Sequence, residues 1–449
     1  MKTIIIIGGG LSGILSAIQL LDISKEVLVK IINTKHPTAL GVAYNTNDPE
    51  HLLNVTAGKM SLYPLLPDHF TDWLIANDYP AENISETFQP RMVYGKYISE
   101  VFNSYISNKQ LEIIDSLAID IIKQTNQYAV ILSSGRNIIA EKIILALGNF
   151  LPSSPKSNSD DFFKSNNYFQ DPWNPAYSKN ISAERSILLI GTGLTMIDCL
   201  LTLKKAGFKG HFFVVSPRGY TPAPHGKIEK YPDFYDEISG QSLLGIFQTV
   251  RMHLKKAESK NISWRGVVDS LRPHVQKIWI NFSEKEKQQF ISHIRHIWGI
   301  ARHRVPVSTY DEIIKLQEEV RLEIIGGRIL DIHEKENVIR VFIRLRKNST
   351  LRELTVGRVI NCTGPQTNYR ELKDDLVVNL LNKKMILSDD LNMGIKTKIS
   401  GQVLYDDHQE SNDIFALGSL LRGVLWETTA VPEIRTQAAF IAKQIIESE

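Results

Sequence analysis

Two runs of apolar residues each end in closely spaced glycines, an arrangement that can hold a phosphate group. The first run, IIII, is followed by Gly8, Gly10 and Gly13, and the second run, ILLI, by Gly191 and Gly193. Each apolar run is typical of a buried parallel strand, and each set of glycines precedes an amphipathic segment. Such glycines make a tight turn and let the backbone approach a pyrophosphate at the start of a helix. The sequence therefore predicts two dinucleotide-binding turns.

The composition indicates a globular chain with a large core. The chain has 449 residues, of which 43% are hydrophobic and 22% charged, with a net charge of +3. This length suits two or three domains. The N-terminal isoleucines are too few for a secretory signal and no segment suits a membrane span, so we expect a cytoplasmic protein. Because Cys199 and Cys362 form no CxxC motif, we expect neither a metal site nor a redox-active dithiol.

An internal repeat accounts for most of the chain. Alternating β-type segments begin at Leu111 and end in a buried strand that stops at Gly148. Similar segments begin at Leu322 and stop at Gly364. We therefore predict an α/β fold with two Rossmann-like dinucleotide-binding domains. The alternative is a chance likeness between two β-rich stretches.

The domains are expected to be nested. Residues 1–180 and 355–449 should form the first domain, and residues 181–354 the second. A helical insertion interrupts the second domain at about residues 225–318. A final helix is predicted over residues 431–447.

The first site departs from the usual pattern at its ribose end. The strand after the first helix ends at Asn33, where an acid commonly accepts hydrogen bonds from both ribose hydroxyls. An asparagine can still accept one such bond. Ser12, inside the glycine turn, could donate to the pyrophosphate, or it could simply pack at a crowded helix start.

The second site has a basic residue at the ribose position. An acidic residue there would favour a ribose without a 2′-phosphate. The corresponding strand ends at Ser216, and Arg218 follows closely. A guanidinium offers several planar donors to a ribose 2′-phosphate. NADPH is therefore favoured over NADH, although an exposed loop arginine would look the same in the sequence.

Several strings along the chain resemble one family. They are GVAY at Gly41, HLLNV at His51, PRMVYGKY at Pro90, IGTGLTMID at Ile190 and GVLWETTAVPEIRTQA at Gly423. The chain is similar to the bacterial FAD/NAD(P)-binding flavoproteins. More distantly it resembles the class B flavin monooxygenases, which include N-hydroxylases of ornithine, lysine and aspartate. The resemblance implies FAD in the first site and NADPH in the second.

The resemblance also implies which residues would surround the flavin. The loop from Gly41 to Met60 would line it, with Asn54 and Met60 near the isoalloxazine, and residues 426–432 would close over its pyrimidine end. The expected cofactor-binding residues are Gly8, Gly10, Ser12, Gly13, Asn33, Gly41, Asn54, Met60, Gly148, Gly191, Gly193, Thr195, Ser216, Arg218, Gly364, Gly418, Trp426 and Thr429. Two features depart from related flavoproteins: Ser419 follows Gly418 where an Asp is common, and the Baeyer–Villiger motif FxGxxxHxxxW is absent.

The helical insertion supplies the candidate substrate residues. Residues 251–305 contain 12 Lys or Arg and 4 Asp or Glu. At helical spacing, Arg295 and Arg302 share a face, and His296 and His303 lie beside it. With Arg304, the residues Arg295, Arg302 and His303 could form a cap that recognises an anion. A solvated basic face is the alternative, and nucleic acid is disfavoured because stacking aromatic residues are not interleaved with the charge.

These features together predict an FAD-dependent, NADPH-consuming monooxygenase. N-hydroxylation of a small anionic amine or amino acid by dioxygen is the favoured reaction, with no membrane partner. The sequence names no catalytic acid or base. Two alternatives remain open: a flavin-dependent NAD(P)H reductase or dehydrogenase, and a non-catalytic nucleotide-binding protein.

Overall fold

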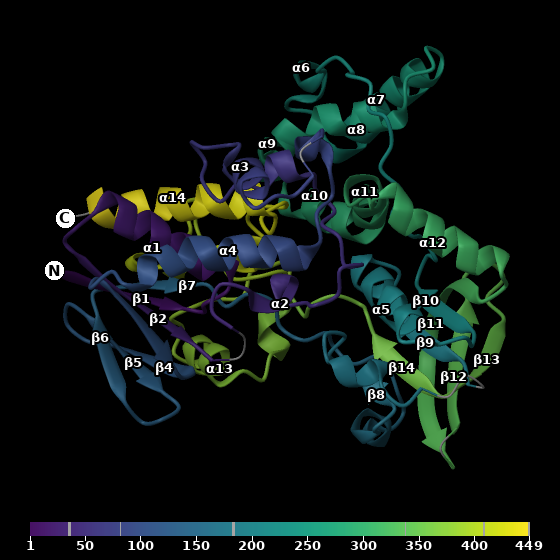
Figure 1. Ribbon diagram of the computed structural model, residues 1–449, viewed down its shortest axis with the longest axis horizontal. Coiled ribbons are helices and arrows are strands. Elements are labelled where there is room, and N and C mark those ends of the chain that lie inside the picture. Colours follow the sequence, from purple (N-terminus) through teal and green to yellow (C-terminus); the bar gives the residue numbers. More distant parts are fainter. Residues whose placement is uncertain (35–36, 81, 182–184, 337, 407–408, 448–449) are drawn as a thin grey trace. The chain divides into compact units, whose positions relative to one another are not determined.

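A computed structural model describes residues 1–34, 37–80, 82–181, 185–336, 338–406 and 409–447. The chain forms two compact units (Figure 1). The first unit comprises Met1–Phe150, Val275–Asn281 and Thr367–Glu449, and the second comprises Leu151–His274 and Phe282–Gln366.

The first unit is built on a six-stranded sheet in the order β15-β16-β7-β1-β2-β3. Its strands are β1 (Lys2–Ile7), β2 (Val27–Asn33), β3 (Leu111–Asp115), β7 (Lys142–Leu145), β15 (Gln402–Asp406) and β16 (Gln409–Ala416). Strands β1, β2, β3, β7 and β16 run parallel, and β15 is the antiparallel edge. The isoleucines of β1 are almost completely buried because both faces of the sheet are covered.

Helices cover one face of this sheet and a small sheet covers the other. Figure 1 shows α1, α4 and α14 side by side on the helical face, where their apolar side chains form one core with β1 and β2. The opposite core joins the sheet to the three-stranded layer β4-β5-β6 and to α13. The helices of this unit are α1 (Leu11–Ile23), α2 (Gly41–Tyr44), α3 (His69–Ala76), α4 (Arg91–Ile106), α9 (Val275–Asn281), α13 (Asp375–Asn382) and α14 (Val431–Glu447). The small layer consists of β4 (Ala118–Lys123), β5 (Tyr128–Leu132) and β6 (Asn137–Ala140).

The second unit repeats this plan. Its sheet has the order β13-β12-β11-β10-β9-β14-β8. The strands are β8 (Tyr168–Phe169), β9 (Ile187–Ile190), β10 (Phe212–Ser216), β11 (Leu322–Lys335), β12 (Val338–Leu345), β13 (Leu351–Val356) and β14 (Arg358–Asn361). Helices α5 (Leu194–Lys205) and α12 (Val307–Glu318) share a core with β9 and β10.

Strand order confirms the internal repeat. In the first unit β1 lies between β2 and β7, and in the second unit β9 lies between β10 and β14, always in parallel. The next strand, β3 or β11, pairs in parallel with β2 or β10. The two units therefore share the four-stranded α/β arrangement expected of Rossmann-like domains.

The unit boundaries differ from those expected from the sequence. Strand β8 pairs with β14, and β14 pairs with β9, so residues 151–180 and 355–366 group with the second unit. The expected boundaries near residues 180 and 355 placed β8 and β14 in the first domain, apart from β9 in the second. Pairing between strands so far apart in the chain leaves no local sequence signal.

The insertion is helical, as predicted, but it does not form one body. Its helices are α6 (Tyr235–Ile238), α7 (Leu243–Glu258), α8 (Trp264–Leu271), α9, α10 (Glu284–Gln289) and α11 (Arg295–Arg302). Helix α12 ends the expected range but packs in the core of the second sheet. A π-helical turn over Phe290–Ile294 joins α10 to α11. Helix α9 belongs to the first unit, whereas the helices on either side belong to the second.

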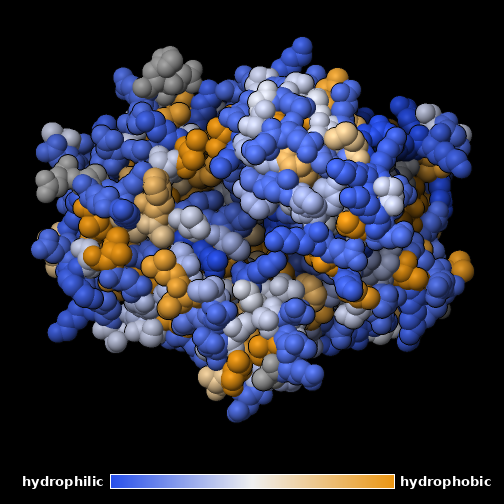
Figure 2. Space-filling view, turned by 90° about the horizontal axis from the view of Figure 1, so that it is seen from above, coloured by the Kyte–Doolittle hydropathy of each residue, from blue (hydrophilic) through white to orange (hydrophobic). Residues whose placement is uncertain are grey.

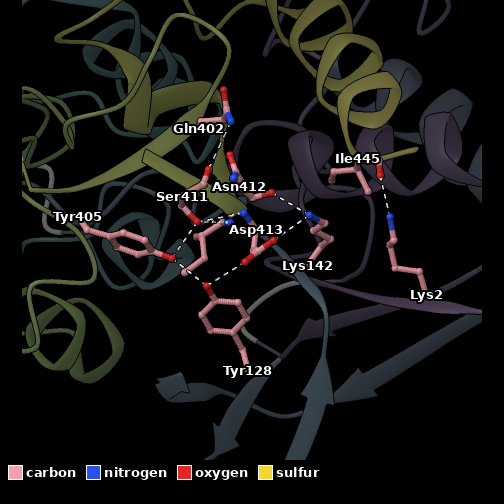
Figure 3. A network of polar contacts seen from close by, with 10 residues as sticks. Lys2, Tyr128, Lys142, Gln402, Tyr405, Ser411, Asn412, Asp413 and Ile445 are labelled. Atoms are coloured by element: carbon pink, nitrogen blue, oxygen red, sulfur yellow. Dashed lines mark hydrogen bonds and ion pairs between the residues drawn. The ribbon is translucent and has the colours of Figure 1, made fainter. Parts of the chain in front are cut away.

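A network of hydrogen bonds connects β16 with β5, β7 and β15 (Figure 3). The ammonium of Lys142, at the start of β7, donates to the Asp413 carboxylate at 2.8 Å and to the Asn412 carbonyl at 2.9 Å. The hydroxyl groups of Tyr128 and Tyr405 lie 2.8 Å apart, and Tyr128 also donates to Asp413. Lys142 begins β7, at the end of the strand opposite the glycine turn, so we assign this network a structural role.

No helix among the described residues combines the length and apolar character needed to cross a membrane. On the face seen in Figure 2, hydrophilic residues predominate and apolar ones occur in small groups.

Candidate nucleotide-binding sites

The first glycine turn lies at the carboxyl end of β1. Gly8 has φ +110°, a conformation that side chains disfavour, and a Cβ there would lie 2.2 Å from the Ala146 carbonyl oxygen. A Cβ at Gly13 would lie 1.9 Å from the Gly8 carbonyl oxygen. The fold itself therefore requires glycine at both positions.

Gly10 has no such structural requirement. Its φ is −77°, and the nearest atom to an added Cβ is the Gly41 Cα at 3.6 Å, an ordinary contact. Gly10 is the N-cap of α1, whose first turn has neither a side-chain cap nor an acidic residue. The uncapped N–H groups and the missing side chain leave room for an anion at this helix start.

Asn33 lies beside this turn, as its position at the end of β2 predicts. Its Oδ1 accepts from the Gly9 N–H at 3.2 Å, and its Nδ2 lies 3.3 Å from the Thr38 hydroxyl. Ser12 lies on the other side, with its Oγ 3.0 Å from the position of a Cβ on Gly418. The structure thus brings Ser12, Asn33, Gly41 and Gly418 to the same turn.

A hydrogen-bond network that the sequence did not reveal holds Gly418. The Gln437 side chain on α14 accepts from the Gly418 N–H at 2.8 Å and donates to the Thr428 hydroxyl at 2.8 Å. The Thr428 hydroxyl in turn donates to the Gly418 carbonyl at 2.9 Å. Gly418 has φ +70°, so this network fixes a turn that favours glycine. The pairing joins a loop to a helix and has no sequence signal.

The residues expected near the flavin ring occupy different environments. The Met60 side chain is buried in the core, and its carbonyl accepts from the Tyr94 hydroxyl at 2.8 Å. Trp426 is half-buried and contacts Trp279 of α9, with ring centroids 5.0 Å apart. Asn54 is half-buried and Thr429 is exposed. The buried position of Met60 leaves only its backbone for a ligand in this conformation.

The second glycine turn has the same construction. Gly191 has φ +107°, and a Cβ there would lie 2.4 Å from the Cys362 carbonyl oxygen. Gly193 has φ −82° and no atom within 4 Å of an added Cβ. It is the N-cap of α5, which also has neither a side-chain cap nor an acid in its first turn. Gly193 is therefore the counterpart of Gly10.

Other predicted residues gather around this second turn. The Thr192 hydroxyl donates to Ser216 Oγ at 3.1 Å, and the Gly219 N–H donates to the same oxygen at 3.0 Å. Thr195 is half-buried in the first turn of α5. Gly364 follows β14 with φ +89° and open space around an added Cβ, as Gly148 follows β7 with φ +68°.

Arg218 extends from the end of β10 towards the insertion. Its guanidinium donates to the Ser292 carbonyl at 3.1 Å, within the π-helical turn before α11. The arginine is half-buried and lies in the loop that follows β10.

The structure does not gather the four candidate substrate residues. Arg304 is 2% exposed, and its guanidinium binds the Asp269 carboxylate through two hydrogen bonds of 3.1 and 2.9 Å. The expectation that Arg304 faces a substrate is therefore wrong, because a buried ion pair satisfies it. Arg302 and His303 lie at the end of α11, where His303 is exposed, whereas Arg295 lies at the beginning.

The two cysteines, distant in sequence, meet behind the second glycine turn. The sulfur atoms of Cys199 and Cys362 lie 3.7 Å apart, and both residues are buried free thiols. Burial raises the pKa of the Cys362 thiol, and the hydrogen bond with Cys199 raises it further. Buried thiols of raised pKa are poor nucleophiles.

Residues 5–150 match a family model described as FAD-NAD(P)-binding. This segment begins within β1 and contains its glycine turn and the strands β2, β3 and β7. A search of curated proteins finds no match.

Solved flavoproteins share the fold over nearly the whole chain. Ornithine N-hydroxylase from Kutzneria sp. 744 has a TM-score of 0.66 at 13% identity, covering 99% of each chain. L-lysine 6-monooxygenase from Pseudomonas syringae has a TM-score of 0.66 at 14% identity, with 99% of each chain covered. Bacillithiol disulfide reductase from Staphylococcus aureus has a TM-score of 0.57 at 14% identity, with 100% of each chain covered. At these identities the likeness establishes the fold alone, an α/β chain with two Rossmann-like units.

Proposed function

We propose that the protein is an FAD-dependent, NADPH-consuming monooxygenase that N-hydroxylates a small amine or amino acid. The observation that carries this proposal is the pair Gly10 and Gly193. Neither backbone conformation nor packing requires glycine at these positions, yet each begins an uncapped helix at the end of a parallel strand. A close approach by a dinucleotide explains both glycines.

The first unit has the features to hold FAD. Gly10 and Gly41 face one another without side chains, so backbone N–H groups at the start of α1 would meet the pyrophosphate. Asn33 would meet the adenosine ribose, and Ser12 and Gly418 the centre of the dinucleotide. Bound FAD would supply hydride acceptance from the coenzyme and transfer of an oxygen atom from dioxygen.

The second unit would hold NADPH. Gly193 and the start of α5 would meet its pyrophosphate, and Arg218 its 2′-phosphate. Residues of the chain would contribute alignment of the two dinucleotides and exclusion of water. This assignment rests on the internal repeat. Gly193 occupies in the second unit the place that Gly10 has in the first, and Arg218 follows the strand that corresponds to the one ending at Asn33.

The neighbouring folds support an amine substrate, since their names include an ornithine N-hydroxylase and a lysine monooxygenase. An acidic amino acid is the substrate class that the basic insertion favours. Arg302 and His303 remain candidates for recognising its carboxylates, whereas Arg304 is satisfied by Asp269. The amine must react unprotonated, so activity should rise with pH as the amine loses its proton.

The test is a screen of amino acids and polyamines with the FAD-loaded protein. Substrate-stimulated NADPH consumption should accompany a product that gains one oxygen atom, labelled when the gas is ¹⁸O₂. Stimulated NADPH consumption without an oxygenated product would overturn the monooxygenase proposal.

A reductase is the second candidate, because a bacillithiol disulfide reductase shares the fold. Such an enzyme would oxidise NADPH under nitrogen when a quinone or disulfide is supplied. The monooxygenase should instead turn over repeatedly only when dioxygen is present.

A further inference from the structure

Arg218 is one member of a group of basic side chains contributed by two segments of the second unit. Its guanidinium donates to the Ser292 carbonyl, three residues before Arg295 begins α11. Arg295 is exposed at the surface. Desolvation by the surrounding atoms and then the charge of Arg218 lower its pKa. The pKa of His296 is lowered mainly by burial and further by the charges of Arg295 and Arg218. The three residues Arg218, Arg295 and His296 are called the basic cluster below.

Arg218 and Arg295 differ from Arg304 and Arg352 of the same unit, each of which forms an ion pair with a carboxylate. Arg304 pairs with Asp269, and Arg352 pairs with Glu323 through two hydrogen bonds of 2.5 and 2.7 Å. Within the described ranges, no carboxylate forms an ion pair with Arg218 or Arg295. Two guanidinium groups that repel one another, beside an imidazole, make a favourable place for a dianion.

The position of the cluster relative to the second glycine turn indicates which anion it would bind. Ser216 ends β10, and its hydroxyl oxygen accepts from Thr192 within the glycine turn and from the Gly219 N–H. Arg218 lies in the chain between Ser216 and Gly219. It therefore lies at the end of β10, where an adenosine ribose would lie. Through Ser292 the insertion reaches the same place.

We propose that Arg295 and His296 of the insertion complete the 2′-phosphate site begun by Arg218, so that the insertion sets coenzyme selectivity. This inference rests on the proposed function, because it requires a coenzyme in the second site. It reassigns Arg295 from the substrate, where the sequence placed it, to the coenzyme. The two guanidinium groups would share the phosphate oxygens, and His296 would donate a further hydrogen bond.

The experiment measures binding to the FAD-loaded full chain by calorimetry, with adenosine 2′,5′-bisphosphate and 5′-AMP as probes. Arg295→Gln should weaken bisphosphate binding about tenfold to a hundredfold, as expected for a charge-assisted contact, and leave 5′-AMP binding unchanged. Arg295→Lys should lie between wild type and Arg295→Gln, because it retains charge without the planar fork. His296→Asn should weaken only the bisphosphate. Arg251→Gln is the matched control, since Arg251 lies in α7 with its guanidinium over the Phe247 ring at 5.9 Å.

The outcomes separate the inference from the proposed function. If Arg295→Gln and His296→Asn leave both probes unchanged while Arg218→Gln weakens the bisphosphate, the inference is overturned and the coenzyme assignment stands. Equal losses for both probes would also overturn it, because the residues would not be reading the 2′-phosphate. If the wild-type protein retains no FAD, or binds neither probe, the proposed function fails first.

Discussion

A Cβ on Gly13 would lie 1.9 Å from the carbonyl oxygen of Gly8, so Gly13 can pack only as a glycine. Gly8 must be a glycine because its φ is +110° and a Cβ there would lie 2.2 Å from the Ala146 carbonyl oxygen. Gly10, between them, meets only an ordinary contact at 3.6 Å and has an unstrained φ of −77°. In this motif the fold requires glycine at positions 8 and 13, whereas the close approach of a ligand accounts for the glycine at position 10. Substitutions at the two kinds of position should have different consequences.

Gly10→Ala should give a folded protein without FAD. The added methyl group fits the ligand-free structure but occupies the place of closest approach to a pyrophosphate. Gly13→Ala should instead fail to accumulate as folded protein. Thermal unfolding followed by circular dichroism reports the fold, and flavin absorbance after gel filtration reports FAD. Full retention of FAD by Gly10→Ala would contradict the assignment of this turn.

Gly193→Ala should separate the two sites. Its methyl group would enter open space at the start of α5, where the coenzyme pyrophosphate is expected. The variant should retain FAD and its thermal stability, while its affinity for both NADPH and NADH falls about tenfold or more, a loss of roughly 1.4 kcal/mol. Flavin content and coenzyme titration measure the two properties on one sample. A loss of FAD together with normal coenzyme affinity would reverse the assignment of the two sites.

The sequence predicted the features that depend on local pattern. The strand and helix around Gly8, the strand and helix around Gly191, and helix α14 over residues 431–447 all form where expected. These elements have apolar periodicity and glycines whose positive φ the chain must accommodate. Strand order then confirmed the repeat.

The sequence could not predict features that depend on pairing between distant residues. Arg304 looked available because nothing in its neighbourhood along the chain identifies Asp269 as its partner. Cys199 and Cys362 looked unrelated because only the packing of α5 against the end of β14 brings their sulfurs to 3.7 Å. Each difference reflects a tertiary contact.

Removing Arg304 should reduce stability rather than change substrate preference. Its guanidinium is buried and bound by two hydrogen bonds to Asp269. Arg304→Gln would leave the Asp269 carboxylate, which is 21% exposed, with only the longer 4.0 Å contact to Arg272. The loss should therefore be smaller than the roughly 3–5 kcal/mol expected for a fully buried pair. Chemical denaturation of wild type and variant measures this difference. An unchanged free energy of unfolding with a raised KM for substrate would restore the expectation that Arg304 binds substrate.

The thiols of Cys199 and Cys362 should resist modification while the protein is folded. Both are buried, and the pKa of Cys362 is raised by burial and by the hydrogen bond with Cys199, so little thiolate forms near neutral pH. A colorimetric thiol reagent at pH 8 should detect essentially no reaction with the native protein and two thiols after denaturation. Rapid native reaction would show that this cluster opens to solvent.

The network around Gly418 should control how tightly FAD is retained. Gln437 accepts from the Gly418 N–H and donates to Thr428, which itself donates to the Gly418 carbonyl. Gln437→Leu removes both interactions and leaves polar groups unsatisfied, at a cost of about 1–3 kcal/mol. Because the Gly418 turn faces Ser12 at the first site, FAD affinity should fall about tenfold.

Gln437→Glu is the matched control for this network. The carboxylate can still accept from the Gly418 N–H but cannot donate to Thr428, so its FAD affinity should lie between those of wild type and Gln437→Leu. Fluorescence titration of the FAD-depleted proteins provides the three affinities, and coenzyme binding at the second site provides an internal reference. If Gln437→Leu lowered thermal stability while leaving FAD affinity equal to wild type, the network would support α14 alone. A graded loss confined to FAD would identify Gln437 as the residue that positions the flavin-facing turn.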